Sequence, residues 1–301
     1  METLAYPAAS WLESVEARKS TQVIRPSTVA FDQDPTAADA FKRAYQRLID
    51  DGTLGRLVAI HGDMGHQQHS MRLTAGNLRF LPWHRVFLYV LESALRAIDS
   101  SVVVPYWDWT AVRAIPAWVS TFTPDVPIPA YVSRMPGHVV LRTPVAQHVR
   151  IVLRNPKDPS ALPTAAMLNV VMSQSSFQPF TTPTDPDPTS GQFPPPFGLE
   201  ALHNMVHNWV GCTMAGVDCG AMSMGMPMPG AFGESPADVL FWLHHANVDR
   251  IWAQWHATHD DPSQFNAGDP NAQLDPWFDA ASGKFTDANT RDTALLNYSY
   301  S

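Results

Sequence analysis

Residues 198–211 read GLEALHNMVHNWVG, and this stretch decides the fold. Its apolar residues recur at helical spacing along one side: Leu199, Leu202, Val206 and Val210. His203 and His207 lie four residues apart beside that apolar side, so a helix points both imidazoles toward the interior. An HxxxH pair alone is weak evidence for a metal site, because two hydrogen-bonded core histidines give the same pattern.

Residues 235–258 predict a longer helix, with Ser235 as N-cap and Pro236 in the first helical position. This segment carries His244 and His245 in adjacent positions among large apolar side chains. Burying two histidines costs free energy unless their ring nitrogens find partners, and a metal ion is such a partner. Three histidines without a carboxylate are typical of a copper or zinc site.

The first half of the chain contains a second group of histidines: His61, His66, His69 and His84. Residues 82–98 predict a helix with Pro82 in its first position, and His84 begins the apolar stripe of that helix. Residues 36–50 and a segment from about residue 55 predict two further helices. We therefore expect a mainly α fold, in which a four-helix bundle holds a two-metal centre, with long loops and few short strands.

Composition limits the partners and the location of the protein. The 301 residues are 45% hydrophobic and carry a formal net charge of -8, so nucleic acids and anionic membranes find no basic surface to bind. No apolar run is long enough for a transmembrane helix, and the first residues do not resemble a leader, so we expect a cytoplasmic protein. Cys212 and Cys219 lie seven residues apart, and the sequence leaves open whether they form a local disulfide.

The kind of metal follows from the residues around the histidines. A zinc protease needs HExxH, whereas the sequence here is HNMVH. A di-iron carboxylate bundle needs two Glu-x-x-His motifs, and only Glu200 to His203 forms one. Six imidazoles with few carboxylates favour two copper ions, which cycle between Cu(I) and Cu(II) and can deliver two electrons to O2 as co-substrate.

Three segments resemble the copper-A and copper-B motifs of the tyrosinase, catechol oxidase and hemocyanin family. They are RFLPWHRVFLYVLE (79–92), ALHNMVHNWVG (201–211) and DVLFWLHHANVDRIW (238–252). The resemblance follows the whole chain in order. It implies one type-3 dicopper catalytic domain over residues 1–301, with a copper-A region at about 55–100 and a copper-B region at about 198–258. It also implies that the C-terminal shielding domain of many relatives is missing.

Carried over motif by motif, the resemblance implies six copper ligands, three for copper A followed by three for copper B: His61, His69, His84, His203, His207 and His245. The second copper-A ligand is the least fixed, because the usual family position falls on Ala75, and His66 is the alternative to His69. In the family, the second histidine of the adjacent pair binds copper, which selects His245 over His244.

Glu200 and Asn204 flank His203 in the sequence. In family members that hydroxylate monophenols, a glutamate and an asparagine in such places hold a water that helps to deprotonate the phenol. The resemblance therefore implies catalytic roles for both residues, Glu200 as the general base. Negative charge at a helix start is favourable in any case, so Glu200 is equally explained as a residue that stabilises the helix end.

The implied function is that of a tyrosinase or polyphenol oxidase, a monooxygenase and oxidase of small phenolic substrates. It would hydroxylate monophenols ortho and oxidise o-diphenols to o-quinones. The alternatives are a catechol oxidase or o-aminophenol oxidase without monophenolase activity, and a hemocyanin-like O2 carrier. A separate copper-delivery or caddie protein is a further expected partner. Near the chain end, Tyr298-x-Tyr300 resembles the tyrosine motif that pairs with an early arginine in this family, here Arg25.

Overall fold

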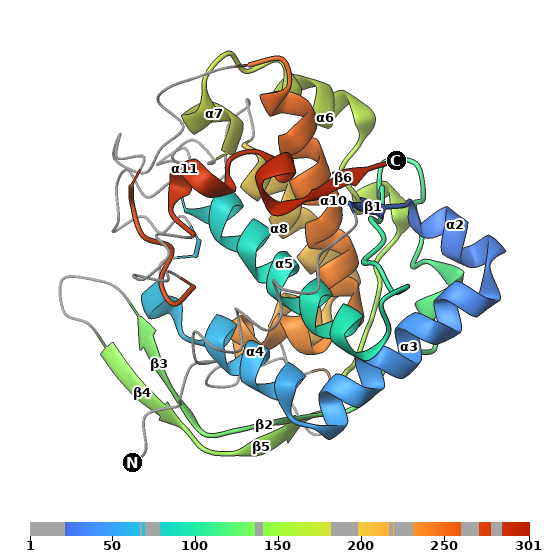
Figure 1. Ribbon diagram of the computed structural model, residues 1–301, viewed down its shortest axis with the longest axis vertical. Helices are drawn as coiled ribbons and strands as arrows, with labels where there is room; N and C mark the ends of the chain where they lie inside the picture. The colour runs from blue at the N-terminus through green and yellow to red at the C-terminus, as the bar shows by residue number, and fades with distance from the viewer. Residues whose placement is uncertain are drawn as a thin grey trace.

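The computed structural model describes residues 22–66, 68–69, 79–135, 141–181, 198–216, 219, 231–259, 271–277 and 285–301. Four helices make the core, as the sequence predicts: α4 (Thr53–Gly62), α5 (Phe80–Ile98), α8 (Leu199–Val210) and α10 (Val239–His256). The helix α10 packs against both α5 and α8, and Figure 1 shows the three crossing the middle of the molecule. This mainly helical core confirms the predicted fold class.

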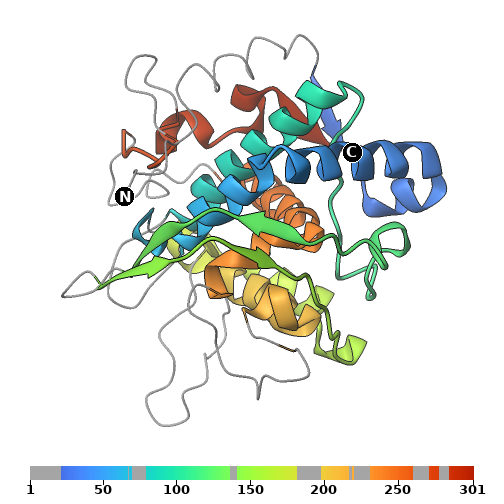
Figure 2. The ribbon, with the colours of Figure 1, turned by 90° about the horizontal axis from the view of Figure 1, so that it is seen from below.

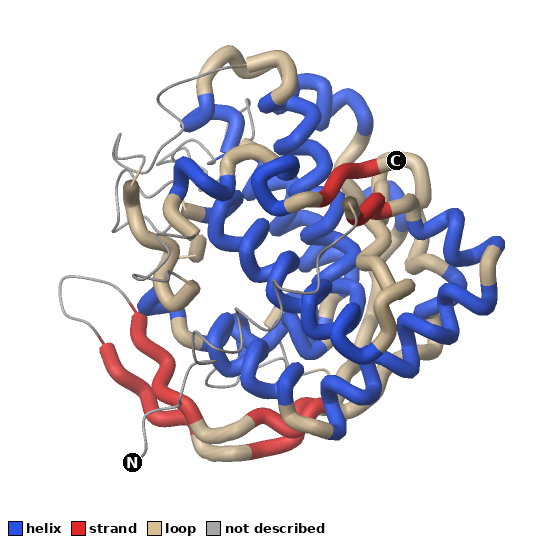
Figure 3. Tube along the Cα trace, in the orientation of Figure 1, coloured by secondary structure: helices blue, strands red, loops and turns tan. Residues whose placement is uncertain are grey.

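Further helices surround this core (Figure 3). The α-helices are α2 (Thr28–Gln33), α3 (Pro35–Asp50), α6 (Ala165–Met172), α7 (Phe177–Thr181), α9 (Cys212–Ala215) and α11 (Asp287–Thr290). The 3-10 helices are η1 (Met64–His66), η2 (Ala117–Val119), η3 (Pro159–Ala161), η4 (Ala231–Ala237) and η7 (Thr293–Leu296). The element η4 packs against α4, α9 and α10, so it lies where both halves of the chain meet.

Within the described residues, the strands form three two-stranded sheets. The strands β2 (Val126–Ile128) and β5 (His148–Arg150) pair antiparallel, as do β3 (Tyr131–Met135) and β4 (Leu141–Val145). These four strands run along one side of the helices (Figure 2), where β2 contacts α4. The strand β1 (Val23–Arg25) pairs parallel with β6 (Tyr298–Tyr300), which joins the two ends of the described chain. No helix within the described ranges is both long and apolar enough for a bilayer span.

A buried charge network fixes α5 against α10. Arg25 forms an ion pair with Glu92 of α5 at 2.9 Å and another with Asp249 of α10 at 3.3 Å. Arg25 also donates to the Tyr300 hydroxyl at 3.0 Å, which confirms the predicted pairing. Arg85 of α5 pairs with the same aspartate. Because buried charges are costly without partners, this arrangement penalises any displacement of the two helices that carry predicted ligands.

Two predicted helix starts are wrong. Ser235 and Pro236 lie inside η4, and α10 begins after Asp238, whose side chain accepts a hydrogen bond from a first-turn backbone amide. The helix α5 begins at Phe80, so Pro82 is its third residue and not its first. Proline is tolerated there because the first four N–H groups of a helix lack intrahelical acceptors.

Candidate dicopper centre

The described residues contain two groups of three histidines whose ligand atoms lie within 4.8 Å of one another. The groups are, in chain order, His61, His69 and His84, and His203, His207 and His244. They face each other across the core, because the ring of His203 on α8 lies 5.9 Å from that of His69 and 6.4 Å from that of His84, centroid to centroid. The imidazoles that the sequence predicts to converge therefore do converge between the four helices.

In the first group, backbone carbonyls hold one side of two rings. His61 donates from Nδ1 to the Gly233 carbonyl of η4 at 2.7 Å, and His84 donates from Nδ1 to the Phe80 carbonyl at 2.8 Å. The two Nε2 atoms are left facing each other at 3.3 Å. A hydrogen bond at Nδ1 fixes the tautomer with its lone pair on Nε2, which is the arrangement found in metal-ligating histidines.

The second group is built in the same way. His207 donates from Nδ1 to the Met214 carbonyl at 2.7 Å, and its Nε2 is buried without a hydrogen-bond partner among the described residues. His203 Nδ1 lies 3.0 Å from the Asn204 side-chain oxygen, and His203 Nε2 lies 3.0 Å from His245 Nε2. Such unpartnered, convergent lone pairs fit copper ions, which bind neutral imidazole nitrogens.

The structure places both residues of the adjacent pair against this second group. The His244 ring stacks on the His203 ring with centroids 5.0 Å apart and belongs to the group of three. His245 reaches His203 by its Nε2 atom and stacks on His84 of the other group. The choice of His245 rests on the family motif and stays a prediction.

Electrostatics keeps these histidines neutral. Burial lowers the pKa of His61, His84 and His203 well below 6.5, and neighbouring imidazoles lower it further. Burial also lowers the pKa of His207, to about 4. The pKa of His245 falls for the same reasons, burial first. At neutral pH these five rings are therefore uncharged, which is the form that a metal ion requires.

His66 and His69 occupy different surroundings. His66 Nδ1 lies 2.7 Å from a carboxylate oxygen of Asp275, and His66 stands outside both groups of three. His69 joins His61 and His84 in the first group, while Ala75 lies outside the described residues. The geometry thus supports His69 over His66 as a third member of that group.

Glu200 and Asn204 both contact predicted ligands. Glu200, buried in the first turn of α8, has a carboxylate oxygen 3.5 Å from His69 Nδ1. Asn204 contacts His203 of its own helix. No sequence signal revealed that Glu200 reaches across to the first group, since the two residues lie far apart in the chain.

Sequence reasoning also missed the carbonyl acceptors at Gly233 and Met214, because a backbone carbonyl has no residue signature. The Phe241 ring of α10 packs on two of these imidazoles, 4.1 Å from the ring of His245 and 5.1 Å from that of His61, centroid to centroid. Phe241 is fully buried, and its ring also lies 5.9 Å from that of His207, centroid to centroid.

Comparisons of sequence and of structure both find similarity to tyrosinases and hemocyanins. A family model described as the common central domain of tyrosinase matches residues 52–258. The tyrosinase of Streptomyces antibioticus is 29% identical over 290 residues, covering 86% of this chain and 96% of that protein. Hemocyanin 1 of Megathura crenulata is 29% identical over 72% of this chain but only 6% of its own length. The solved tyrosinase of Burkholderia thailandensis superposes with a TM-score of 0.62 over 93% of this chain and 74% of that one, at 18% identity.

Proposed function

Because the chain belongs to the tyrosinase family, we propose that it hydroxylates monophenols ortho and oxidises the resulting o-diphenols to o-quinones. At the coarser level it is a copper-dependent oxidoreductase that oxidises small phenolic substrates with O2. When bound, the two copper ions supply two electrons to O2 and act as Lewis acids toward the phenol oxygen. The observation that carries the proposal is the pair of facing imidazole groups, with Nε2 atoms turned toward one another.

The protein's own residues divide the remaining work. His61, His69 and His84 would hold one copper ion, and His203, His207 and His245 the other. Glu200 would accept the phenol proton through a water molecule that Asn204 helps to hold, as a carboxylate beside a metal pair can do. The buried position of Glu200 against His69 supports this role. Phe241 would exclude water from the side of the centre that it covers.

The test is a paired assay of the copper-loaded protein with tyramine and with its o-diphenol, dopamine. We expect turnover of both substrates, with consumption of O2 and formation of the o-quinone. Turnover of dopamine alone would reduce the function to that of a catechol oxidase. Preferential turnover of o-aminophenol would assign the chain to the o-aminophenol oxidases.

A hemocyanin-like carrier is the rival from another functional class. A carrier would bind O2 reversibly and leave catechols unchanged, so steady quinone formation excludes it. The identity to tyrosinases extends over nearly the whole length of those proteins, whereas the matched hemocyanin is far longer than the matched segment. This difference in coverage favours the enzyme.

We further propose a copper-delivery or caddie protein as partner, and a cytoplasmic location. Loading of the purified copper-free chain by free Cu(II) salts to two ions per chain would make such a partner unnecessary. The disulfide between Cys212 and Cys219 is of a kind that persists in oxidising compartments, so thiol titration of protein taken directly from cells tests the location.

A further inference from the structure

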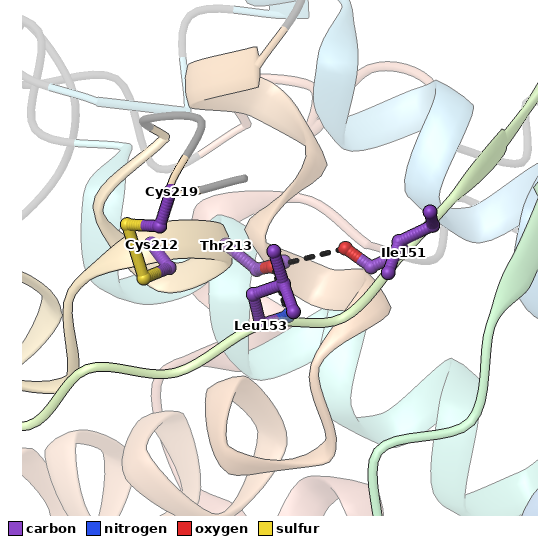
Figure 4. The surroundings of a disulfide bond; sticks show 5 residues. All are labelled: Ile151, Leu153, Cys212, Thr213 and Cys219. Atoms are coloured by element: carbon purple, nitrogen blue, oxygen red, sulfur yellow. Dashed lines mark hydrogen bonds between the residues drawn. A yellow bond between two sulfur atoms is a disulfide. The ribbon is translucent and has the colours of Figure 1, made fainter. Parts of the chain in front are cut away.

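A disulfide closes the turn that follows α8, and its two cysteines take no part in the proposed copper chemistry. Cys212, the first residue of α9, is bonded to Cys219 (Figure 4). Within the loop that this bond closes lies Met214, whose carbonyl accepts the Nδ1 hydrogen bond of His207 at 2.7 Å. A cross-linked turn therefore sets the orientation of a predicted copper-B ligand.

The backbone of this turn is held in conformations that most residues avoid. Gly211 and Gly216, on either side of α9, have φ values of 71° and 65°. Cys212 also has a positive φ, 44°, where its Cβ makes the backbone unfavourable. A conformation of this kind persists only where surrounding bonds hold it, and the disulfide is one such bond.

Hydrogen bonds between Thr213 and a neighbouring segment also hold the same turn. The Thr213 amide donates to the Leu153 carbonyl at 3.1 Å, and the Thr213 hydroxyl accepts from the Leu153 amide at 2.9 Å. The hydroxyl also donates to the Ile151 carbonyl at 3.4 Å, as Figure 4 shows. The residue before Met214 is thus tied to a neighbouring segment, and Cys212 is tied covalently.

We infer that the Cys212–Cys219 disulfide is a positioning clamp for copper B. It keeps the Met214 carbonyl at His207 Nδ1, so that Nε2 stays turned toward the metal. The inference rests on the proposed copper binding by His207. Loss of a hydrogen-bond partner behind a ligating histidine lowers metal affinity about 10- to 100-fold, and we expect the lower end of this range without the disulfide. We expect copper A to be affected less, because Gly233 and Phe80, the carbonyl partners of His61 and His84, lie outside the loop that the disulfide closes, although the element η4 that carries Gly233 contacts α9.

The test compares the double variant Cys212→Ser/Cys219→Ser with a matched control, Ser27→Ala. The control removes the side chain that caps α2, far from the histidines in the chain, and lowers general stability without touching the turn after α8. Each copper-loaded protein is dialysed against graded concentrations of a chelator, and retained copper per chain is measured together with the melting temperature. We expect the double variant to lose one of its two ions at about 10-fold lower chelator concentration. The control should release copper as the wild type does.

A second variant covers the case in which the double variant fails to fold. Thr213→Val keeps the disulfide but removes the hydroxyl contacts to Leu153 and Ile151, and we expect a smaller shift that again concerns one ion only. Equal retention of both ions in wild type and variants would overturn the clamp while leaving the copper site in place. Simultaneous loss of both ions together with a lower melting temperature would also overturn it, because that is what a merely structural crosslink does. Failure of the wild type to bind copper would contradict the proposed function itself.

Discussion

The two histidine groups differ in where their supporting contacts come from. In the first group, His61 relies on Gly233 and His69 lies against Glu200, and both partners belong to the second half of the chain. In the second group, His207 relies on Met214, and His203 relies on its sequence neighbour Asn204. Copper A would thus rest partly on contacts that span the whole fold, with only His84 supported by its own helix, whereas copper B would be supported within its own half. This asymmetry predicts which substitutions affect one ion and which affect both.

The largest effect is expected from two single variants, each of which removes one predicted copper ligand from one of the groups. His84→Ala and His203→Ala should each leave about one copper ion per chain and lower catechol turnover by at least about 10³-fold, because the two-electron step needs both ions. Metal analysis after dialysis, together with O2 consumption, measures both quantities. Two retained ions with near-normal turnover in either variant would remove that histidine from the ligand set.

The second prediction separates the two adjacent histidines. His245→Ala should lose copper B and activity, whereas His244→Ala should keep two ions and lose mainly packing against His203. Each variant serves as the control for the other, since both remove a fully buried imidazole from the same helix. Copper content decides the matter. The reverse outcome would assign the ligand to His244, in line with the grouping of the ring nitrogens.

The sequence predicted the second histidine group more directly than the first. His203 and His207 lie at helical spacing beside an apolar side, and His244 and His245 stand together among apolar residues, so local sequence patterns marked them as candidates. His69 lies between elements, after η1, where no periodicity exists and only the family motif and elimination could select it. The fold class and the four core helices were predictable because amphipathic patterns are local.

The backbone partners and the exact helix starts were not predictable. The carbonyls of Gly233 and Met214 act through the path of the chain and not through a side chain, so any residue type could occupy those places. The start of α10 depends on Asp238, which competes successfully with Ser235 as the N-cap. Arg154 pairs with Asp238 at 2.6 Å, and this tertiary contact is invisible to a local pattern.

The third prediction concerns Glu200, which lies on the helix of the second histidine group but contacts His69 of the first. Glu200→Gln keeps the shape of the side chain but removes its charge, so it should lower tyramine turnover by about 10²-fold and dopamine turnover much less. It should also weaken copper A by about 10-fold, because Glu200 lies against His69. Asn204→Ala is a control for copper retention only, since Asn204 contacts His203 and should weaken copper B instead. Its tyramine turnover should also fall, because Asn204 is proposed to hold the same water. Equal losses with both phenols and unchanged retention of both ions would remove both roles from Glu200.

The smallest effect is expected for the copper-free protein as a function of pH. Burial holds the pKa of His207 at about 4 and that of His203 and His245 well below 6.5, whereas the same rings titrate near 6.5 in the unfolded chain. Between these values the unfolded state binds more protons, so the free energy of unfolding must decrease as the pH falls from about 6.5 toward 4. Each such histidine contributes at most about 1.4 kcal/mol per pH unit in that window.

Urea denaturation of the copper-free protein at pH 7.5, 6.0 and 5.0 measures this slope, provided that the m value stays constant. His207→Gln should make the slope shallower by removing one titrating ring, and His61→Gln should do the same for the first group. The same measurement on the copper-loaded protein provides a further comparison. Its loss of stability in acid should be steeper than that of the copper-free form, because protons compete with copper at every bound nitrogen. If the stability of the copper-free protein does not change between pH 7.5 and 5.0, these histidine rings must be hydrated in solution. The space between the two histidine groups would then be open to water.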